Sequence, residues 1–148
     1  MSEKIAFIGL GAMGGPMASN IIKKGTKVSV FDINSERMKK VTEVGGTGCK
    51  NINETVSNAE IVVTMLPATQ QVNEVMLGQN GLISQLKPGS IIMDMSTISP
   101  KGTDEVKKEC DKHEIHFVDA PVGRLVSHAI TGDSLFMVGC DNEIIFKK

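Results

Sequence analysis

Apolar residues occur along this chain in short runs, which alternate with longer segments where they recur every three or four positions. Nearly continuous apolar runs at residues 5–8, 61–66 and 91–95 are typical of parallel strands that are buried on both faces of a sheet. Branched aliphatic and apolar residues predict further strands at residues 27–31, 115–119 and 135–139.

Helical spacing of apolar residues, with glycine and proline as punctuation, predicts helices between these strands. They cover residues 16–24, 35–44, 53–58, 72–77 and 100–112, with a short helical turn between Gly81 and Lys87. The alternation predicts one α/β domain over residues 1–148, with a mostly parallel, doubly wound sheet and helices on both faces. In such sheets ligands bind beyond the carboxyl ends of the strands, so function is expected in the segments that follow them.

The first strand runs directly into a G-x-G-x-x-G turn that opens a helical segment, Gly9-Leu10-Gly11-Ala12-Met13-Gly14. Gly9 permits a sharp turn, Gly11 lets a pyrophosphate approach the backbone, and Gly14 allows the helix to pack closely on the strand. The start of the helix offers unpaired N–H groups to phosphate. These features predict a Rossmann-type dinucleotide-binding site, although a tight turn with only a structural role is the alternative.

Asp32 supports the dinucleotide interpretation because it ends the next strand, 18 residues after Gly14. A carboxylate at about this spacing accepts hydrogen bonds from a ribose hydroxyl. It would also repel a 2′-phosphate, so NAD is the expected cofactor and NADP is less favoured.

Composition excludes several classes of partner. The 148 residues carry a net charge of −1 and contain no Tyr or Trp, so neither nucleic acid nor an anionic membrane is an expected partner. No apolar stretch approaches the ~20 residues that span a bilayer. The N-terminus leaves no room for a signal peptide, and three widely spaced cysteines form no metal pattern. We therefore expect a cytoplasmic protein with reduced thiols and no metal site.

Four motifs, in order, resemble those of the β-hydroxyacid dehydrogenase family over essentially the whole chain. They are Gly9 to Asn20, Met65-Leu66-Pro67, Asp94-Met95-Ser96-Thr97 and Asp119-Ala120-Pro121-Val122. The resemblance implies that the first two motifs and Asp32 contact the cofactor and that Thr97 lies near its nicotinamide end. The cofactor-binding residues expected are Gly9, Leu10, Gly11, Ala12, Met13, Gly14, Asp32, Met65, Leu66, Pro67 and Thr97. A hydroxyl at Ser96 or Thr97 can donate to a cofactor or substrate oxygen, or cap the helix that begins near Pro100.

One departure from the family pattern points to the substrate. Family members usually continue the last motif with Ser-Gly-Gly, whereas this chain has Gly123-Arg124-Leu125, a form similar to the sulfolactaldehyde reductase branch. A guanidinium presents a planar fork to an oxyanion, so Ser96, Gly123 and Arg124 are the expected substrate-binding residues. A sulfonate and a carboxylate both suit Arg124, and an exposed loop arginine is the alternative.

The resemblance implies an NAD-dependent oxidoreductase that acts on a small acidic β-hydroxy acid or semialdehyde. Sulfolactaldehyde is the first expected substrate, and 3-hydroxyisobutyrate or tartronate semialdehyde the second. The family's general acid is a lysine on a later helix, so it would lie beyond Lys148, with an all-helical domain, and no catalytic residue is expected in this chain. A full-length enzyme would be a homo-oligomer. A stand-alone NAD(H)-binding or sensing module is the alternative of another class.

Overall fold

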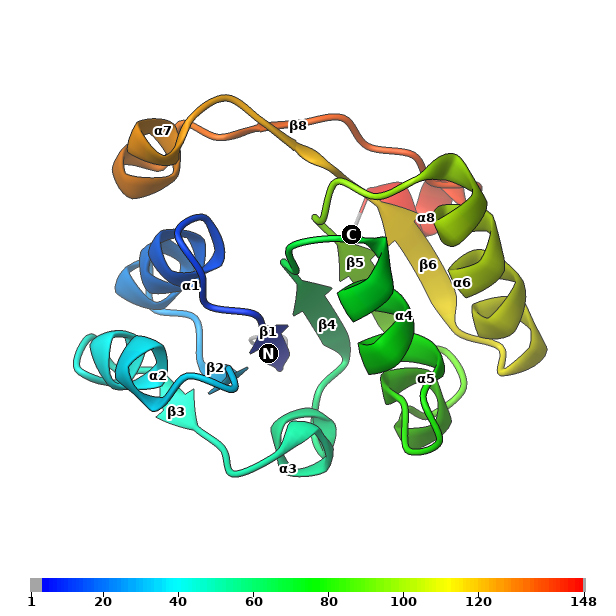
Figure 1. The fold of residues 1–148 in the computed structure, drawn as a ribbon, viewed down its shortest axis with the longest axis horizontal. Helices are drawn as coiled ribbons and strands as arrows, with labels where there is room; N and C mark the ends of the chain where they lie inside the picture. Colours follow the sequence, from blue (N-terminus) through cyan, green and yellow to red (C-terminus); the bar gives the residue numbers. More distant parts are fainter. Residues whose placement is uncertain (1–3, 148) are drawn as a thin grey trace.

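The computed structural model describes residues 4–147, which form a six-stranded parallel sheet with helices on both faces (Figure 1). The strands are β1 (Ile5–Ile8), β2 (Val28–Phe31), β3 (Thr47–Gly48), β4 (Ile61–Thr64), β5 (Ile91–Asp94) and β6 (His116–Asp119). Their order is β3-β2-β1-β4-β5-β6, so the chain runs outward from β1 to one edge and then returns to its other side. The predicted doubly wound α/β fold is confirmed, and the strand order reverses between β1 and β4.

The first six helices match the predicted segments, with shifted ends, and two short helices follow them. They are α1 (Gly14–Lys23), α2 (Ser35–Thr42), α3 (Ile52–Val56), α4 (Thr69–Leu77), α5 (Leu82–Gln85), α6 (Pro100–Lys112), α7 (Val126–Thr131) and α8 (Glu143–Phe146). Side-chain oxygens of Asn34 and Ser99 accept hydrogen bonds at the starts of α2 and α6, which fixes where these helices begin. Helix α1 begins two residues earlier than predicted, inside the glycine turn.

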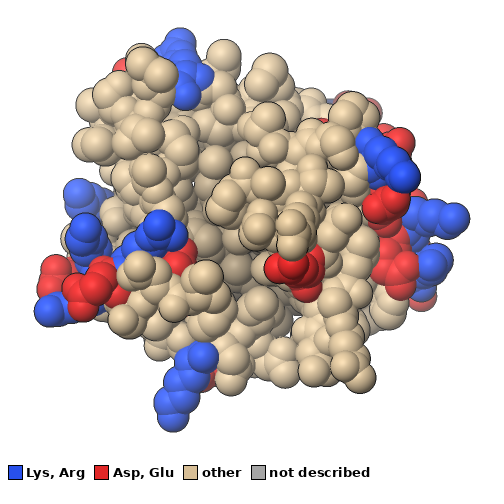
Figure 2. Space-filling view, in the orientation of Figure 1, with Lys and Arg blue, Asp and Glu red and all other residues tan. Residues whose placement is uncertain are grey.

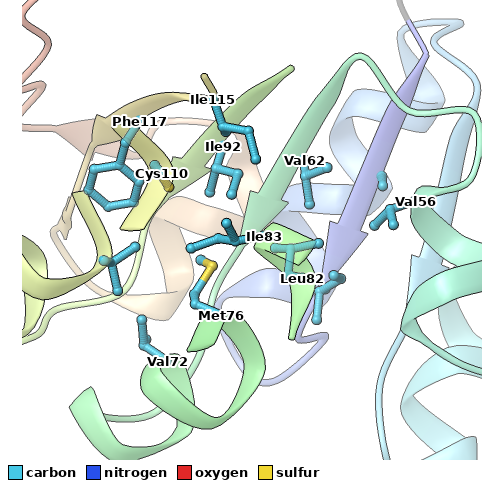
Figure 3. Packing of buried hydrophobic residues seen from close by; sticks show 13 residues of the cluster. Val56, Val62, Val72, Met76, Leu82, Ile83, Ile92, Cys110, Ile115 and Phe117 are labelled. Carbon is cyan, nitrogen blue, oxygen red and sulfur yellow. The ribbon is translucent and has the colours of Figure 1, made fainter. Parts of the chain in front are cut away.

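Alternate residues of β1 enter two separate cores on opposite faces of the sheet. Ala6 and Ile8 pack with α3, α4, α5 and α6 on one face, in the cluster shown in Figure 3. Phe7 packs with α1, α2 and α7 on the other face. Because both faces are covered, the strands are apolar on both sides, which explains their nearly continuous apolar runs.

The segment that follows β6 departs from the prediction. Its strand β8 (Leu135–Phe136) is shorter than the predicted 135–139 and pairs antiparallel with β7 (Val122–Gly123), outside the main sheet. Helix α7 between them was not predicted. We refer to residues 122–146 as the C-terminal arm. Its elements α7 and β8 lie across the top of the view in Figure 1, and α8 packs near β6.

The C-terminal arm carries much of the exposed apolar surface of the described residues. Side chains with more than a third of their area exposed there are Leu125, Val126, Ile130, Leu135, Phe136, Met137, Val138, Ile144 and Phe146. In Figure 2 the charged side chains gather toward the two sides of the molecule, while the middle and top of this face carry few. Among residues 4–147, no helix combines the length and the apolar character needed to cross a bilayer.

Candidate functional site

A groove of about 460 Å³ lies at the carboxyl ends of β1, β2 and β4, where the strand order reverses. Nine of the predicted cofactor-binding residues line it: Gly9, Gly11, Ala12, Met13, Gly14, Asp32, Met65, Leu66 and Pro67. Leu10 lies on the other side of the turn, where it lines a neighbouring groove. Most of the residues predicted to bind the cofactor therefore lie around one groove.

The three glycines of the turn have different surroundings. Gly9 has a φ of +92°, and a Cβ there would overlap the carbonyl oxygen of Met65. A Cβ on Gly14 would overlap the carbonyl oxygen of Gly9, so this position needs glycine for close packing. A Cβ on Gly11 would meet only Nη1 of Arg37, at 4.0 Å. Gly11 is therefore not required by the packing of the chain, and the space beside it is open to a ligand.

The start of α1 faces the same groove. Its N-cap residue, Met13, makes no side-chain hydrogen bond to the first turn of the helix. Pro16 has no N–H, and the N–H of Gly15 donates to the carbonyl oxygen of Gly11 at 3.0 Å. The helix therefore presents the N–H of Gly14 and the positive end of its dipole at the turn. This arrangement suits the pyrophosphate of a dinucleotide, which carries negative charge and accepts hydrogen bonds.

Asp32 is 8% exposed and joins the end of β2 to the glycine turn. Its Oδ2 accepts a hydrogen bond from the backbone N–H of Leu10 at 2.7 Å, and its Oδ1 accepts one from the N–H of Asn34 at 2.8 Å. A carboxylate oxygen can accept two hydrogen bonds, so each keeps capacity for a ribose hydroxyl in the groove. The residues present therefore fit the adenosine half of NAD.

Arg37 is a groove residue that the sequence analysis missed. Its Nη1 lies 3.8 Å from Oδ2 of Asp32, and the half-exposed side chain lines the groove beside Gly11. A guanidinium here adds positive charge where phosphate would approach. Its position in the first turn of α2, five residues after Asp32, was the available signal. Helix α4 contributes further residues that no motif marked, namely Gln71, Glu74 and Val75.

The opposite wall of the groove is tied to β5 through Ser96. The backbone N–H of Leu66 donates to Oγ of Ser96 at 2.9 Å, and that hydroxyl donates to Oδ1 of Asp94 at 2.6 Å. Both Asp94 and Ser96 are completely buried. Burial raises the pKa of the Asp94 carboxyl, against the opposing effect of hydrogen bonds from Ser96 and Thr64. The Ser96 hydroxyl is thus engaged within the protein, and its predicted substrate contact stays a prediction.

The remaining predicted residues lie outside this groove. Thr97 is exposed just after β5, and Ser99 rather than Ser96 or Thr97 caps α6. Gly123 belongs to β7. Arg124 is exposed, has a φ of +72°, and donates from Nη1 to the carbonyl oxygen of Asp133 at 2.9 Å. Their roles at the nicotinamide and the substrate stay predictions.

A glycine-rich turn, a carboxylate at the end of β2 and a groove at the reversal of strand order together define a dinucleotide-binding domain. A family model described as the NAD binding domain of 6-phosphogluconate dehydrogenase matches residues 4–148. The chain belongs to this family of NAD-binding domains, and NAD is its cofactor.

The relatives are dehydrogenases and reductases, as the motifs predicted. The chain is 40% identical to 3-sulfolactaldehyde reductase of Escherichia coli (strain K12) over 135 residues, which are 91% of this chain and 45% of that protein. It is 39% identical over 138 residues to a probable mitochondrial 3-hydroxyisobutyrate dehydrogenase of Dictyostelium discoideum, covering 93% of this chain and 43% of that protein. The chain therefore spans less than half the length of these relatives.

A solved structure shows the same fold. The 3-hydroxyisobutyrate dehydrogenase of Mycobacterium tuberculosis, determined with L-serine, superposes with a TM-score of 0.91 at 31% sequence identity. The match covers 99% of this chain and 50% of the solved chain.

Proposed function

We propose that this chain is the cofactor-binding part of an oxidoreductase that moves a hydride between NAD and a small acidic β-hydroxy acid or its semialdehyde. The observation that carries the proposal is the groove that places Gly11, Asp32 and Leu66 around one site in a chain related to such enzymes. Bound NAD would supply the hydride donor or acceptor. The residues of this chain bind and orient it.

Each part of the groove has a distinct task in this proposal. The backbone at Gly11 and the first turn of α1 receive the pyrophosphate, with Arg37 adding positive charge beside it. Asp32 accepts hydrogen bonds from the adenosine ribose, and Leu66 flanks the cofactor. Thr97 would lie near the nicotinamide end, beyond the part of the groove described above.

The position and the free N–H donors of Arg124 favour an anionic substrate. Arg124 lies in the segment that follows β6, and its side chain is exposed. One of its five N–H donors is bonded to the carbonyl oxygen of Asp133. The remaining donors can bind a sulfonate or a carboxylate as a planar fork. Together with the 40% identity to a 3-sulfolactaldehyde reductase, this favours 3-sulfolactaldehyde, with 3-hydroxyisobutyrate or tartronate semialdehyde as the second choice.

Catalysis requires a proton donor near the substrate carbonyl oxygen. Lysine does not occur among the residues that line the 460 Å³ groove. We propose that the general acid belongs to a further, helical part of a full-length, homo-oligomeric enzyme. Residues 1–148 should therefore bind cofactor without efficient turnover.

Cofactor choice is tested by titration calorimetry of residues 1–148 with NADH and NADPH. We expect tighter binding of NADH, because the Asp32 carboxylate repels a 2′-phosphate, and a smaller difference in Asp32→Ala. Equal affinities in the unchanged chain would contradict the assignment of Asp32. Absence of turnover with good NADH binding in the full-length protein would favour the alternative, an NAD(H)-sensing module.

Substrate choice is tested with Arg124→Lys in the full-length protein. Loss of the bidentate fork should lower kcat/KM for 3-sulfolactaldehyde by roughly ten- to hundredfold, since charge-assisted hydrogen bonds contribute about 1.5–3 kcal/mol. A neutral aldehyde of similar size provides the control and should lose much less. An equal loss for both aldehydes would remove Arg124 from the substrate site.

A further inference from the structure

Three buried polar side chains meet at the carboxyl ends of β4 and β5. Thr64, Asp94 and Ser96 are all completely buried, and Thr64 and Asp94 are register partners on the two strands. Oδ1 of Asp94 accepts hydrogen bonds from the Thr64 hydroxyl at 2.8 Å, the Ser96 hydroxyl at 2.6 Å and the Ser96 N–H at 3.1 Å. Its Oδ2 has no hydrogen-bond partner among the described residues.

Burying such a cluster costs free energy of folding. Removing a carboxyl from water costs free energy, and an unpaired buried oxygen adds to that cost. Asp119 on β6, the register partner of Asp94, also has its pKa raised by its own burial and by the charge of Asp94. Apolar residues of similar size would avoid these costs, so the cluster calls for a role other than stability.

The cluster reaches the cofactor groove through one hydrogen bond. Pairing between β1 and β4 ends where the N–H of Met65 donates to the carbonyl oxygen of Ile8 at 2.9 Å. The next residue, Leu66, lies beyond the strand pairing, and its N–H donates instead to Oγ of Ser96. Placement of this groove wall therefore depends on the Ser96 hydroxyl.

Asp94 determines the direction of that hydroxyl. A hydroxyl has one hydrogen and two acceptor positions, and Ser96 gives its hydrogen to Asp94. Its lone pairs are then available for the N–H of Leu66. The side chain of Leu66 in turn lies against the glycine turn, since a Cβ on Gly9 would be 3.0 Å from its Cδ2.

We propose that Asp94 and Ser96 are positioning residues for the cofactor, which hold Leu66 against the glycine turn at the separation that a dinucleotide requires. The proposal deepens the proposed function, because it concerns the same groove. It assigns Ser96 an internal role in place of direct contact with a substrate. The Thr64 hydroxyl donates to the same carboxyl, but the N–H of Leu66 bonds to Ser96 and not to Thr64, so Thr64 is not one of the proposed positioning residues.

The test uses residues 1–148 and measures NADH affinity by calorimetry and the hydrogen-exchange rate of the Leu66 amide by NMR. Ser96→Ala removes the acceptor of the Leu66 N–H and should weaken NADH binding by roughly three- to tenfold, the effect of one net hydrogen bond. It should also speed exchange at Leu66. Asp94→Ala should produce the same two changes, because the Ser96 hydroxyl loses its direction.

Asp94→Asn is the conservative rescue. The amide oxygen can replace Oδ1 as the acceptor for Ser96, so NADH affinity and Leu66 exchange should stay within about twofold of the unchanged protein. Thr64→Val removes a different donor from the same carboxyl and should lower thermal stability while leaving affinity within the same margin. Ser90→Ala changes a buried serine just before β5, away from the groove, and is the matched control.

The outcomes separate the two proposals. Unchanged NADH affinity and unchanged Leu66 exchange in folded Ser96→Ala would overturn the positioning role. An equal loss of affinity in Thr64→Val would also overturn it, because the effect would then be general stability. If the unchanged protein binds no NADH, the proposed function fails. The exchange rate of the Leu66 amide would still show whether Ser96 and Asp94 hold Leu66 in place. If Asp94→Ala does not fold, Ser96→Ala and Asp94→Asn decide the matter.

Discussion

Replacement of Gly11 by valine should weaken cofactor binding and leave the domain folded, whereas replacement of Gly14 should damage the fold itself. The distinction comes from what an added Cβ would meet. At Gly14 it would overlap the backbone carbonyl oxygen of Gly9, which cannot move without shifting the strand end. At Gly11 it would meet only the end of a flexible side chain, Arg37 Nη1, at 4.0 Å.

The two effects should differ clearly in size. Overpacking usually costs 1–3 kcal/mol, and a rigid backbone neighbour places Gly14→Ala at about 3 kcal/mol or more. For a domain of this length that lowers Tm by roughly 6–12 °C. Gly11→Ala should change stability by less than about 1 kcal/mol, as expected for a glycine replaced where the backbone is compatible. Gly11→Val should be similar in stability and should obstruct the pyrophosphate more fully.

Thermal unfolding followed by circular dichroism and NADH titration followed by fluorescence measure the two effects separately. Loss of even one charge-assisted hydrogen bond to the pyrophosphate would weaken binding of NADH to Gly11→Val by roughly ten- to hundredfold. Retained affinity in Gly11→Val would show that the turn is only structural. A Tm loss in Gly11→Ala as large as that in Gly14→Ala would refute the reasoning from Cβ contacts.

Three further predictions concern single groups. Burial raises the pKa of Asp94, so the folded protein binds this proton at higher pH than the unfolded chain, and stability is lost as pH rises through the folded pKa. Chemical denaturation should show Asp94→Asn gaining stability relative to the unchanged protein as pH rises above 3.8, the ordinary pKa of the carboxyl. Burial raises the pKa of the Cys110 thiol to about 12, so little reactive thiolate forms there at neutral pH. Iodoacetamide should therefore label the half-buried Cys140 well before Cys110 or the buried Cys49. Mass spectrometry of the native protein measures the order of labelling. Asn34 accepts hydrogen bonds from two N–H groups at the start of α2, so Asn34→Ala should lose about 0.5–2 kcal/mol in urea unfolding, and no loss would contradict its capping role.

The central sheet and the glycine turn were predictable because their signals are local. A parallel strand covered on both faces is apolar throughout, and Gly9 and Gly14 follow β1 at a spacing that close packing requires. Asp32 could be found by its distance from the turn. Strand β3 was missed because two residues within a glycine-rich stretch carry almost no pattern, and only pairing with β2 makes them a strand.

The missed parts depend on contacts between distant residues. Helix α7 contains β-branched residues that disfavour a helix, and it is held by Nδ2 of Asn20, which donates to the carbonyl oxygen of Ala129 at 2.8 Å across 109 positions. Arg37 was missed because a charged residue on a helix is usually solvated. The segment containing Ser96 was identified correctly, but its sequence could not reveal that the hydroxyl turns inward to Asp94.

Few contacts join the C-terminal arm to the rest of the domain, and this affects which part unfolds first. Its antiparallel strands pair mainly with each other, and its ties to the rest include the bridge between Asp119 and Gly139 and the Asn20 contact with α7. Of residues 122–146, only Ala129 is classed as buried. Release of the arm would uncover the core residues that pack against Ala129 and Ile145, while the core between the sheet and α3, α4, α5 and α6 contains no residue of the arm. We therefore expect the arm to unfold locally more often than the six-stranded sheet does.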